Sequence, residues 1–212
     1  IKIFNKIIDF IKQSSKKADY TMCAITGIAG LAPILDITKI SKNLAIANKE
    51  SVICGWNLIE KEMITYKTKF IPIDSEHFSI LSLIKNIKIS SIEKIYITAS
   101  GGPFLNLPKA KFKDITPENA IKHPNWKMGK KISIDSSTLM NKVFEIIEAH
   151  RMFKLPLSKF KILIHPNSYV HALVKFNNGI TKLLIHDTSM TIPIFNSLYY
   201  DMNNKKLESK EI

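Results

Sequence analysis

Apolar and polar positions along the first third of the chain predict helices and strands in turn. The opening residues show apolar side chains at helical spacing, and short apolar strands are expected at residues 20–26, 44–47 and 68–73. A small-residue turn at residues 27–30 leads into a helical pattern that reaches about residue 46, and another helix is expected at residues 52–63. Strands that alternate with helices favour a mostly parallel sheet, with ligand sites at the carboxyl ends of its strands.

Beyond about residue 75 the pattern changes to that of an α+β region. The strongest helical pattern of the chain covers residues 138–153, and Asn177-Asn178-Gly179 is a turn signal between two strands of a hairpin. A polar segment at residues 106–131 shows little regular pattern beyond a short helix at residues 116–122, and such stretches are more often functional than idle. The other elements expected here are a helix at residues 77–87 and strands at residues 94–99, 161–164, 169–176 and 180–185.

Composition excludes several classes of function. The chain has 212 residues, 45% of them hydrophobic, and contains no run of about 18 apolar residues that could span a membrane. Its opening helix lacks the cleavage site of a signal peptide. The net charge of +13 comes almost entirely from dispersed lysine, because Arg151 is the single arginine. Nucleic-acid readers favour arginine, so no nucleic-acid partner is expected. Cys23 and Cys54 lie in no metal-ligand spacing, which favours a reducing, cytoplasmic location.

Asp74 and Glu76, which close an apolar run, are the most informative polar residues of the chain. In extended backbone, residues two positions apart point the same way, so these carboxylates converge at a strand end. Hard cations such as Mg²⁺ or Mn²⁺ take oxygen ligands of this kind. The alternative is an acidic pair in a turn that is merely solvated. Lys49, flanked by Asn48 and Glu50 at another strand end, could bind an anion or a hydroxyl group.

The helix at residues 138–153 carries a second group of candidate residues. Asn141, Lys142 and Glu145 lie side by side outside its apolar face, and Ser136 stands at its expected start. These side chains outline a phosphate site, since the free N–H groups and the dipole of a helix start favour an anion. Alternatively, Ser136 is a helix cap and Lys142 and Glu145 form a solvated ion pair. The residues expected to form the buried face are Leu139, Met140, Val143, Phe144, Ile146, Ile147 and Phe153.

Two loops carry further candidate chemistry. Ser100-Gly101-Gly102-Pro103 follows a strand, so the glycines permit close backbone approach and the serine can offer a hydroxyl group to the same anion, although a simple tight turn is equally consistent. Residues 123–129 place His123, Trp126 and Gly129 in a polar region, which favours a lid that closes over a ligand, with packing as the alternative. The strand histidines interpreted as structural or surface residues are His165, His171 and His186.

Taken in order, these segments resemble the 1-deoxy-D-xylulose 5-phosphate reductoisomerase family. Six linked motifs across nearly the whole chain make the resemblance very specific. The strings that carry it are Ala47-Asn48-Lys49-Glu50-Ser51, Pro72-Ile73-Asp74-Ser75-Glu76-His77, Ala99-Ser100-Gly101-Gly102-Pro103-Phe104, residues 123–129, Lys131-Ile132-Ser133-Ile134-Asp135-Ser136, and Met140-Asn141-Lys142 with Glu145.

The resemblance implies the roles of individual residues. Asp74, Glu76 and Glu145 are expected to bind Mg²⁺ or Mn²⁺, and Asn48, Glu50 and Gly129 to contact NADPH. Ser100, Ser136, Asn141 and Lys142 are expected to hold the substrate phosphate, while Lys49, Ser75, Glu76 and His123 contact the sugar part and Trp126 caps it. The residues expected to take part in catalysis are Lys49, Asp74, Glu76, His123, Trp126 and Glu145. The implied reaction is NADPH-dependent reductive isomerisation of 1-deoxy-D-xylulose 5-phosphate to 2-C-methyl-D-erythritol 4-phosphate in the non-mevalonate isoprenoid pathway, by a homodimer.

The chain also departs from the family pattern. The family's Gly-rich dinucleotide turn and its helical C-terminal domain are not seen in this sequence. Val143 stands where the family usually has glycine, and residues 186–190 differ from the family's usual Pro-Asp-Met-containing stretch. The expected fold is therefore α/β: the second half of a Rossmann-like NADPH domain at residues 1–74, an α+β catalytic domain at residues 75–201, and the start of a linker at residues 202–212. The alternative function is an inactive fragment that binds metal and substrate.

Overall fold

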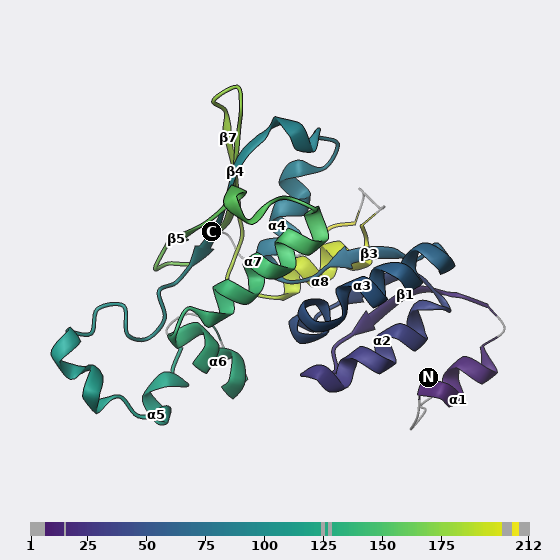
Figure 1. Ribbon diagram of the computed structural model, residues 1–212, viewed down its shortest axis with the longest axis horizontal. Coiled ribbons are helices and arrows are strands. Elements are labelled where there is room, and N and C mark those ends of the chain that lie inside the picture. Colours follow the sequence, from purple (N-terminus) through teal and green to yellow (C-terminus); the bar gives the residue numbers. More distant parts are fainter. Residues whose placement is uncertain (1–6, 15, 124–125, 127–128, 201–204, 208–212) are drawn as a thin grey trace. The chain divides into compact units, whose positions relative to one another are not determined.

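The computed structural model describes residues 7–14, 16–123, 126, 129–200 and 205–207, which form two compact units (Figure 1). The first unit contains Ile1–Asp74 and Pro193–Lys206, and the second contains Ser75–Ile192. The division after Asp74 falls where the sequence pattern changes. The return of the chain to the first unit at Pro193 was not evident from that pattern. Most of the predicted linker at residues 202–212 lies outside the described residues.

The first unit is built on a three-stranded parallel sheet in the order β1-β2-β3. Cys23 pairs with Ile46, and Ile46 pairs with Pro72, so the carboxyl ends of all three strands lie at one edge. This arrangement confirms the predicted α/β class. The strands are β1 (Ala18–Cys23), β2 (Ser41–Ile46) and β3 (Lys69–Pro72).

Helices of three to 18 residues precede and connect these strands. The prediction that the second helix continues to about residue 46 is wrong, because α2 ends at Thr38 and β2 begins at Ser41. The Ser41 hydroxyl donates to the Ile37 carbonyl at 2.7 Å, and the Ile40 amide donates to the same oxygen at 3.2 Å, so the end of the helix is hydrogen-bonded just before the strand. The helices are α1 (Ile7–Gln13), η1 (Ile28–Gly30), α2 (Leu31–Thr38) and α3 (Lys49–Tyr66), with most of α8 (Thr191–Leu198).

The second unit contains a mixed four-stranded sheet in the order β5-β4-β6-β7. β5 runs parallel to β4, whereas β6 is antiparallel to both β4 and β7. The predicted hairpin turn is confirmed, and Gly179 there has a φ of 84°, which glycine adopts without strain. The strands are β4 (Ile92–Ala99), β5 (Phe160–Ile164), β6 (Val170–Phe176) and β7 (Thr181–Ile185).

Two long helices of this unit cover one face of its sheet. Ile80 of α4 and Ala149 of α7 join Ile95, Ile97 and Val174 in a core where each residue is 0% exposed. Two short helices were not predicted: α6 (Lys130–Ser137), which contains Ser136, and α8. The remaining helices are α4 (Ser75–Ile84), η2 (Ile89–Ser91), η3 (Lys109–Asp114), α5 (Pro117–Ala120), α7 (Met140–Phe153) and η4 (Leu157–Lys159).

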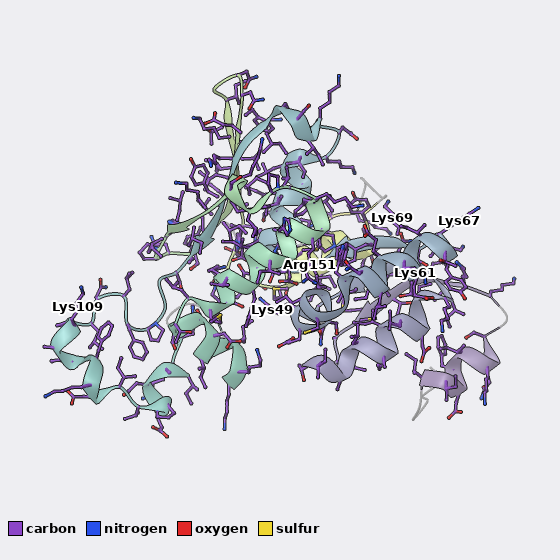
Figure 2. The ribbon with its side chains drawn as sticks, in the orientation of Figure 1. Lys49, Lys61, Lys67, Lys69, Lys109 and Arg151 are labelled. Atoms are coloured by element: carbon purple, nitrogen blue, oxygen red, sulfur yellow. The ribbon has the colours of Figure 1, made fainter. Side chains whose placement is uncertain are left out.

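The surface of each unit carries dispersed lysines. Lys61 on α3, Lys67 just after it and Lys69 on β3 are exposed, and Lys109 begins η3 in the second unit (Figure 2). In the part of the chain that the structure describes, no helix is both long and apolar enough to cross a membrane.

Candidate metal and substrate site

The first turns of α7 bury polar side chains and expose apolar ones. Asn141 and Lys142 are each 8% exposed and Glu145 is 1% exposed, whereas Met140 and Val143 are 44% and 45% exposed. The predicted orientation, with the apolar row buried, is therefore wrong for this half of the helix. Lysine and glutamate are almost never buried unless they are paired. Lys142 and Glu145 therefore require partners within hydrogen-bonding distance.

The buried face of α7 meets the start of α4 in a closed ionic cluster. The Lys142 ammonium lies 2.6 Å from Glu76 Oε1 and 2.7 Å from Glu145 Oε2. Asn141 Nδ2 donates to Glu145 Oε1, and the Ser75 hydroxyl donates to Glu76 Oε2 at 2.5 Å. One ammonium thus bonds two carboxylates, and the three groups together carry a net charge of −1 if all are ionised. We call these five residues the ionic cluster.

Chain direction explains why Glu76 reaches this cluster. Strand β3 ends at Pro72, and Ser75 and Glu76 form the first turn of α4, where the helix dipole favours a carboxylate. Asp74 is the last residue of the first unit and lies two residues before Glu76. Within that unit, Lys49 Nζ lies 3.4 Å from Asp74 Oδ2. Two predicted site residues from different strand ends, Lys49 and Asp74, are therefore paired.

A buried histidine of α4, His77, and a further acid of α7, Glu148, lie beside the cluster. His77 Nε2 lies 2.8 Å from the backbone carbonyl of Glu145 and donates to it, since a carbonyl can only accept. His77 Nδ1 lies 3.9 Å from Glu148 Oε2. His77 and Glu148 are 1% and 4% exposed. No role was predicted for His77 or Glu148, although the spacing of Glu148 from Glu145 puts both acids on one face of the helix.

The donor set of the cluster fits a hard divalent cation. Glu76 and Glu145 bring carboxylate oxygens within 4.8 Å of one another, and both side chains are almost inaccessible to water. Mg²⁺ and Mn²⁺ prefer such oxygen ligands. The Lys142 ammonium shows that the carboxylates already accommodate a positive charge between them.

The glycine turn after β4 lies beside α6. Gly102 has a φ of 70°, and a Cβ there would stand 3.0 Å from the Ser136 carbonyl oxygen. Glycine is therefore required both by the backbone conformation and by the close approach. This contact brings the turn that contains Ser100 next to Ser136. Ser136 lies in the last turns of α6, so the expectation that it begins the next helix is wrong.

His123 links Ser100 to Trp126. The Trp126 amide donates to His123 Nδ1 at 3.0 Å, so a neutral ring carries its proton on Nε2, which lies 3.0 Å from Ser100 Oγ. The Gly102 amide also donates to Ser100 Oγ, at 3.1 Å. Burial, and then the Lys142 ammonium, lower the pKa of His123. With two N–H groups directed at its oxygen, Ser100 retains its hydroxyl hydrogen for an acceptor such as an anion.

The predicted lid is only partly described. Residues 124–125 and 127–128 lie outside the described residues, whereas Trp126 is half-buried. Gly129 is exposed and precedes α6 as its N-cap, where its carbonyl accepts from Ser133. The role of this segment as a lid stays a prediction.

Asn48 fastens the small-residue turn of the first unit. Its Oδ1 accepts from the Ser51 amide at 2.6 Å and caps α3, and its Nδ2 donates to the carbonyls of Ile25 and Gly27. Asn48 is 3% exposed, and Glu50, in the first turn of α3, is half-buried. Asn48 therefore shapes the edge of the sheet where the sequence predicts cofactor contacts.

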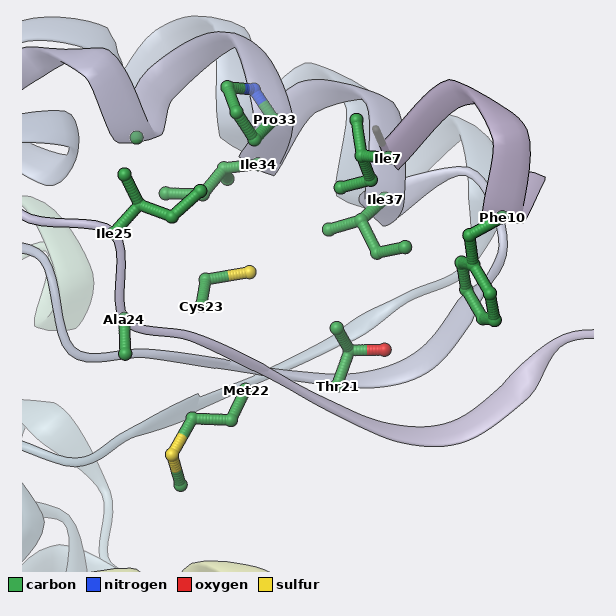
Figure 3. Close-up of a pocket in the computed structure, with 11 residues that line it drawn as sticks. Ile7, Phe10, Thr21, Met22, Cys23, Ala24, Ile25, Pro33, Ile34 and Ile37 are labelled. Atoms are coloured by element: carbon green, nitrogen blue, oxygen red, sulfur yellow. The ribbon is translucent and has the colours of Figure 1, made fainter. Parts of the chain in front are cut away.

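An apolar cavity of about 410 Å³ lies at this turn, between β1 and the helices α1 and α2 (Figure 3). Cys23 lines it together with Ile25 and Gly30, and none of the described residues that line it carries a charged side chain. Burial raises the pKa of the Cys23 thiol to about 11, so it stays neutral. This cavity suits an apolar group and offers nothing to a phosphate.

Comparison with known proteins agrees with this geometry. Residues 70–153 match the model of the 1-deoxy-D-xylulose 5-phosphate reductoisomerase C-terminal domain, and residues 6–55 match the model of 1-deoxy-D-xylulose 5-phosphate reductoisomerase. A relative of that name from Pelagibacter ubique is 61% identical over 100% of this chain and 55% of its own length. Another, from Clostridium novyi, is 42% identical over 92% of the chain and 51% of its own length.

Solved structures with the same name superpose closely. A crystal structure of DOX-P reductoisomerase in complex with NADPH, fosmidomycin and magnesium gives a TM-score of 0.84 at 35% identity, covering 94% of this chain and 51% of that one. The Zymomonas mobilis enzyme in complex with NADPH gives 0.82 at 37% identity, covering 96% and 52%. The chain spans about half the length of the relatives it matches. It belongs to the 1-deoxy-D-xylulose 5-phosphate reductoisomerase family.

Proposed function

We propose that this chain carries the catalytic centre of an NADPH-dependent reductoisomerase that converts 1-deoxy-D-xylulose 5-phosphate to 2-C-methyl-D-erythritol 4-phosphate. The observation that carries the proposal is the ionic cluster, in which Glu76 and Glu145 are buried around one ammonium. Burial of charge is unfavourable for folding, so a cluster of this kind points to binding. The relatives named 1-deoxy-D-xylulose 5-phosphate reductoisomerase support this reaction.

Asp74, Glu76 and Glu145 would hold Mg²⁺ or Mn²⁺. Glu76 and Glu145 share the cluster, and chain connectivity keeps Asp74 beside Glu76. When bound, the cation stabilises negative charge that develops on substrate oxygens. A cation at these carboxylates would replace the neutralising role of the Lys142 ammonium, which then becomes available to the substrate phosphate.

The substrate phosphate would lie at Ser100, Ser136, Asn141 and Lys142. The Ser100 hydroxyl can donate to it, because the oxygen of that group already accepts from Gly102 and from His123. A clamped phosphate fixes the orientation of the reacting carbons. The residues proposed to contact the sugar part are Lys49, Ser75, Glu76 and His123, with Trp126 covering it.

NADPH would bind at the carboxyl edge of the parallel sheet, with contacts from Asn48, Glu50 and Gly129. This edge is where open α/β sheets bind ligands. The cofactor supplies the hydride of the reduction. Asn48 would act largely by holding the turn at residues 25–30 in place, since three of its hydrogen bonds serve the fold.

The proposed assembly is a homodimer in the cytoplasm. One face of the second unit's sheet exposes apolar side chains: Leu163 is 41% exposed, Leu183 50% and Ile185 48%. Exposed apolar patches on a sheet often mark protein contacts. Sedimentation equilibrium would show a dimer for the parent and a monomer for Leu183→Lys.

Steady-state kinetics of the complete protein that contains this chain would test the proposed reaction. NADPH oxidation should require both 1-deoxy-D-xylulose 5-phosphate and Mg²⁺ or Mn²⁺, and Glu145→Gln should abolish it while the fold persists. Glu93→Gln, which removes an acid from an exposed ion pair with Lys175, is the matched control and should be fully active. Near-normal turnover in Glu145→Gln would refute the metal assignment. Binding of metal and substrate without NADPH oxidation would instead identify the alternative, an inactive binding fragment.

A further inference from the structure

Four rings of the second unit follow one another from Trp126 to α4. The ring centres of Trp126 and His171 are 6.1 Å apart with an edge-on angle of 79°. His171 and His186 stack face to face, 3.6 Å apart and 13° from parallel. His186 and Phe78 follow at 6.3 Å and 57°. We call these four residues the ring column.

Phe78, the last residue of the ring column, lies two positions after Glu76 of the ionic cluster in the sequence. Phe78 lies on α4, and Glu76 on the same helix accepts from the Lys142 ammonium. His171 lies on β6, and His186 directly follows β7. The column therefore joins the tryptophan that the proposed function places over the substrate to the helix that carries a proposed metal ligand.

Both imidazoles are held in fixed orientations. His171 Nε2 lies 3.2 Å from the His186 carbonyl oxygen, and His186 Nδ1 lies 2.7 Å from the Asp187 carbonyl oxygen. A carbonyl only accepts, so each of these nitrogens carries a proton and donates it. Burial lowers the pKa of both rings, that of His171 to about 4, so both stay neutral. Neutral rings stack without charge repulsion.

The backbone of β6 is shaped to present His171. The pairing of β6 with β7 shifts between Val170 and Ala172, so His171 is the extra residue of a β-bulge. A bulge re-aims a side chain relative to a regular strand. The Thr98 hydroxyl fixes this position, since it lies 2.5 Å from the Val170 carbonyl oxygen and 3.2 Å from that of His171.

Simple core packing does not account for these two histidines. His171 and His186 are 2% and 5% exposed, and His186 Nε2 is buried without a hydrogen-bond partner among the described residues. A buried polar atom without a partner destabilises the fold, whereas leucine or phenylalanine would fill the same space without that penalty. His186 also stands in the stretch where the chain departs from the family pattern.

We propose that His171 and His186 are positioning residues whose stacked rings hold the Trp126 indole at the substrate site. The expected consequence is tighter binding of the phosphosugar, and this consequence rests on the proposed function. The positioning requires the rings themselves and no proton transfer. An aromatic ring at position 186 should therefore replace histidine, and a small side chain should not.

The position of Trp126 can be tested directly by ¹⁹F NMR of protein labelled with 5-fluorotryptophan. The chain has two tryptophans, and Trp126→Phe assigns the resonances. His186→Ala should move the Trp126 resonance towards the value of free 5-fluorotryptophan, and His186→Phe should return it. His150→Ala removes a histidine that bonds the Leu155 carbonyl outside the column, and it should leave the resonance unmoved. An unmoved resonance in His186→Ala, or equal shifts in the Ala and Phe variants, would overturn the proposal.

Calorimetric titration with 1-deoxy-D-xylulose 5-phosphate in the presence of Mg²⁺ tests the consequence. The dissociation constant should rise about 2- to 10-fold in His186→Ala, the range expected for loss of one aromatic pair, and return in His186→Phe. Mn²⁺ affinity should not change in either variant. A shifted resonance with unchanged substrate affinity would overturn the role in substrate binding. If the parent binds no substrate, the proposed function fails, and the NMR result alone still decides whether the stack positions Trp126.

Discussion

Helices α3 and α7 show opposite relations between sequence pattern and burial. In α3 the buried side chains are mainly apolar, including Val52, Trp56 and Ile59. In the first half of α7 the buried side chains are Lys142 and Glu145 with their neighbours, and apolar side chains face outward. Helix α3 is kinked at Gly55 and packs Trp56 edge-on against Phe70 of β3, whereas α7 contributes Ala149 to the core of the second unit. Only α7 therefore buries groups whose ionised forms prefer water.

The two regions differ in what their buried polar side chains bond to, and therefore in how these side chains affect stability. The polar residues of the first unit's turn bond mainly to backbone groups, as Asn48 does, and this fastens the fold. The polar residues of α7 bond to one another and to Glu76, and their contribution to stability is small or negative compared with apolar packing. Natural proteins violate the usual patterning mainly at functional sites.

Removal of the ammonium from the ionic cluster should have the largest effect. Lys142→Met leaves Glu76 and Glu145 buried without their shared cation, and we expect the free energy of unfolding to fall by about 3–5 kcal/mol. Urea unfolding at neutral pH measures this loss. Added Mn²⁺ should recover part of it, because a bound cation restores the missing charge.

Lys175→Met is the matched control, since its ion pair with Glu93 is about 40% exposed on both sides. An exposed pair of this kind contributes little to stability, because water screens the attraction between its charges. Equal losses in Lys142→Met and Lys175→Met would show that the buried cluster has no special energetic status, and the contrast between the two helices would fail.

Acid should destabilise the second unit through His171. Its pKa is about 4 in the folded chain and near 6.5 when unfolded, so the unfolded chain binds more protons between these values. The contribution of neutral His171 to the free energy of unfolding is therefore fully present above pH 6.5. It falls by about 3 kcal/mol as the pH drops towards 4. His171→Gln cannot titrate here, so its unfolding free energy should fall less between pH 7 and pH 4. Parallel curves for the two proteins would contradict the assignment.

The smallest effect concerns the first unit. Asn48→Ser keeps a cap for α3 but loses both amide donors to the carbonyls of Ile25 and Gly27, and we expect a loss of about 1–2 kcal/mol. Asn48→Ala loses the cap as well, which adds about 1 kcal/mol. Thermal unfolding of both variants measures the two contributions. A serine variant as stable as the parent would mean that the turn does not depend on these donors.

Sequence pattern predicted most elements of the fold, and its failures have local causes. Helix α2 was extended too far because apolar residues continue at helical spacing past Thr38, and the Ser41 hydroxyl that helps to end it carries no periodic signal. Helix α6 was missed because residues 130–137 are mainly polar. The hairpin and the placement of Lys49 and Asp74 at or near strand ends followed from the sequence pattern, whereas the pairing of these two side chains did not.

The sequence predicted which residues form the candidate site better than it predicted how their side chains are arranged. The motifs named Glu76, Lys142 and Glu145, yet no local pattern indicates that a polar row on α7 would be the buried one, since its partner lies 66 residues away along the chain. The stack of His171 on His186 was equally hidden, because it depends on a bulge that the alternation of β6 does not reveal.

Binding of Mn²⁺ decides whether the ionic cluster is a metal site. Titration of the protein with Mn²⁺, followed by the electron paramagnetic resonance signal of the free ion, gives the dissociation constant of the parent and of Glu145→Gln. We expect one site in the parent and a loss of affinity of more than about 100-fold in the variant, because loss of a direct ligand should exceed the 10- to 100-fold effect of an outer partner. Equal affinity in the folded variant would contradict the metal assignment.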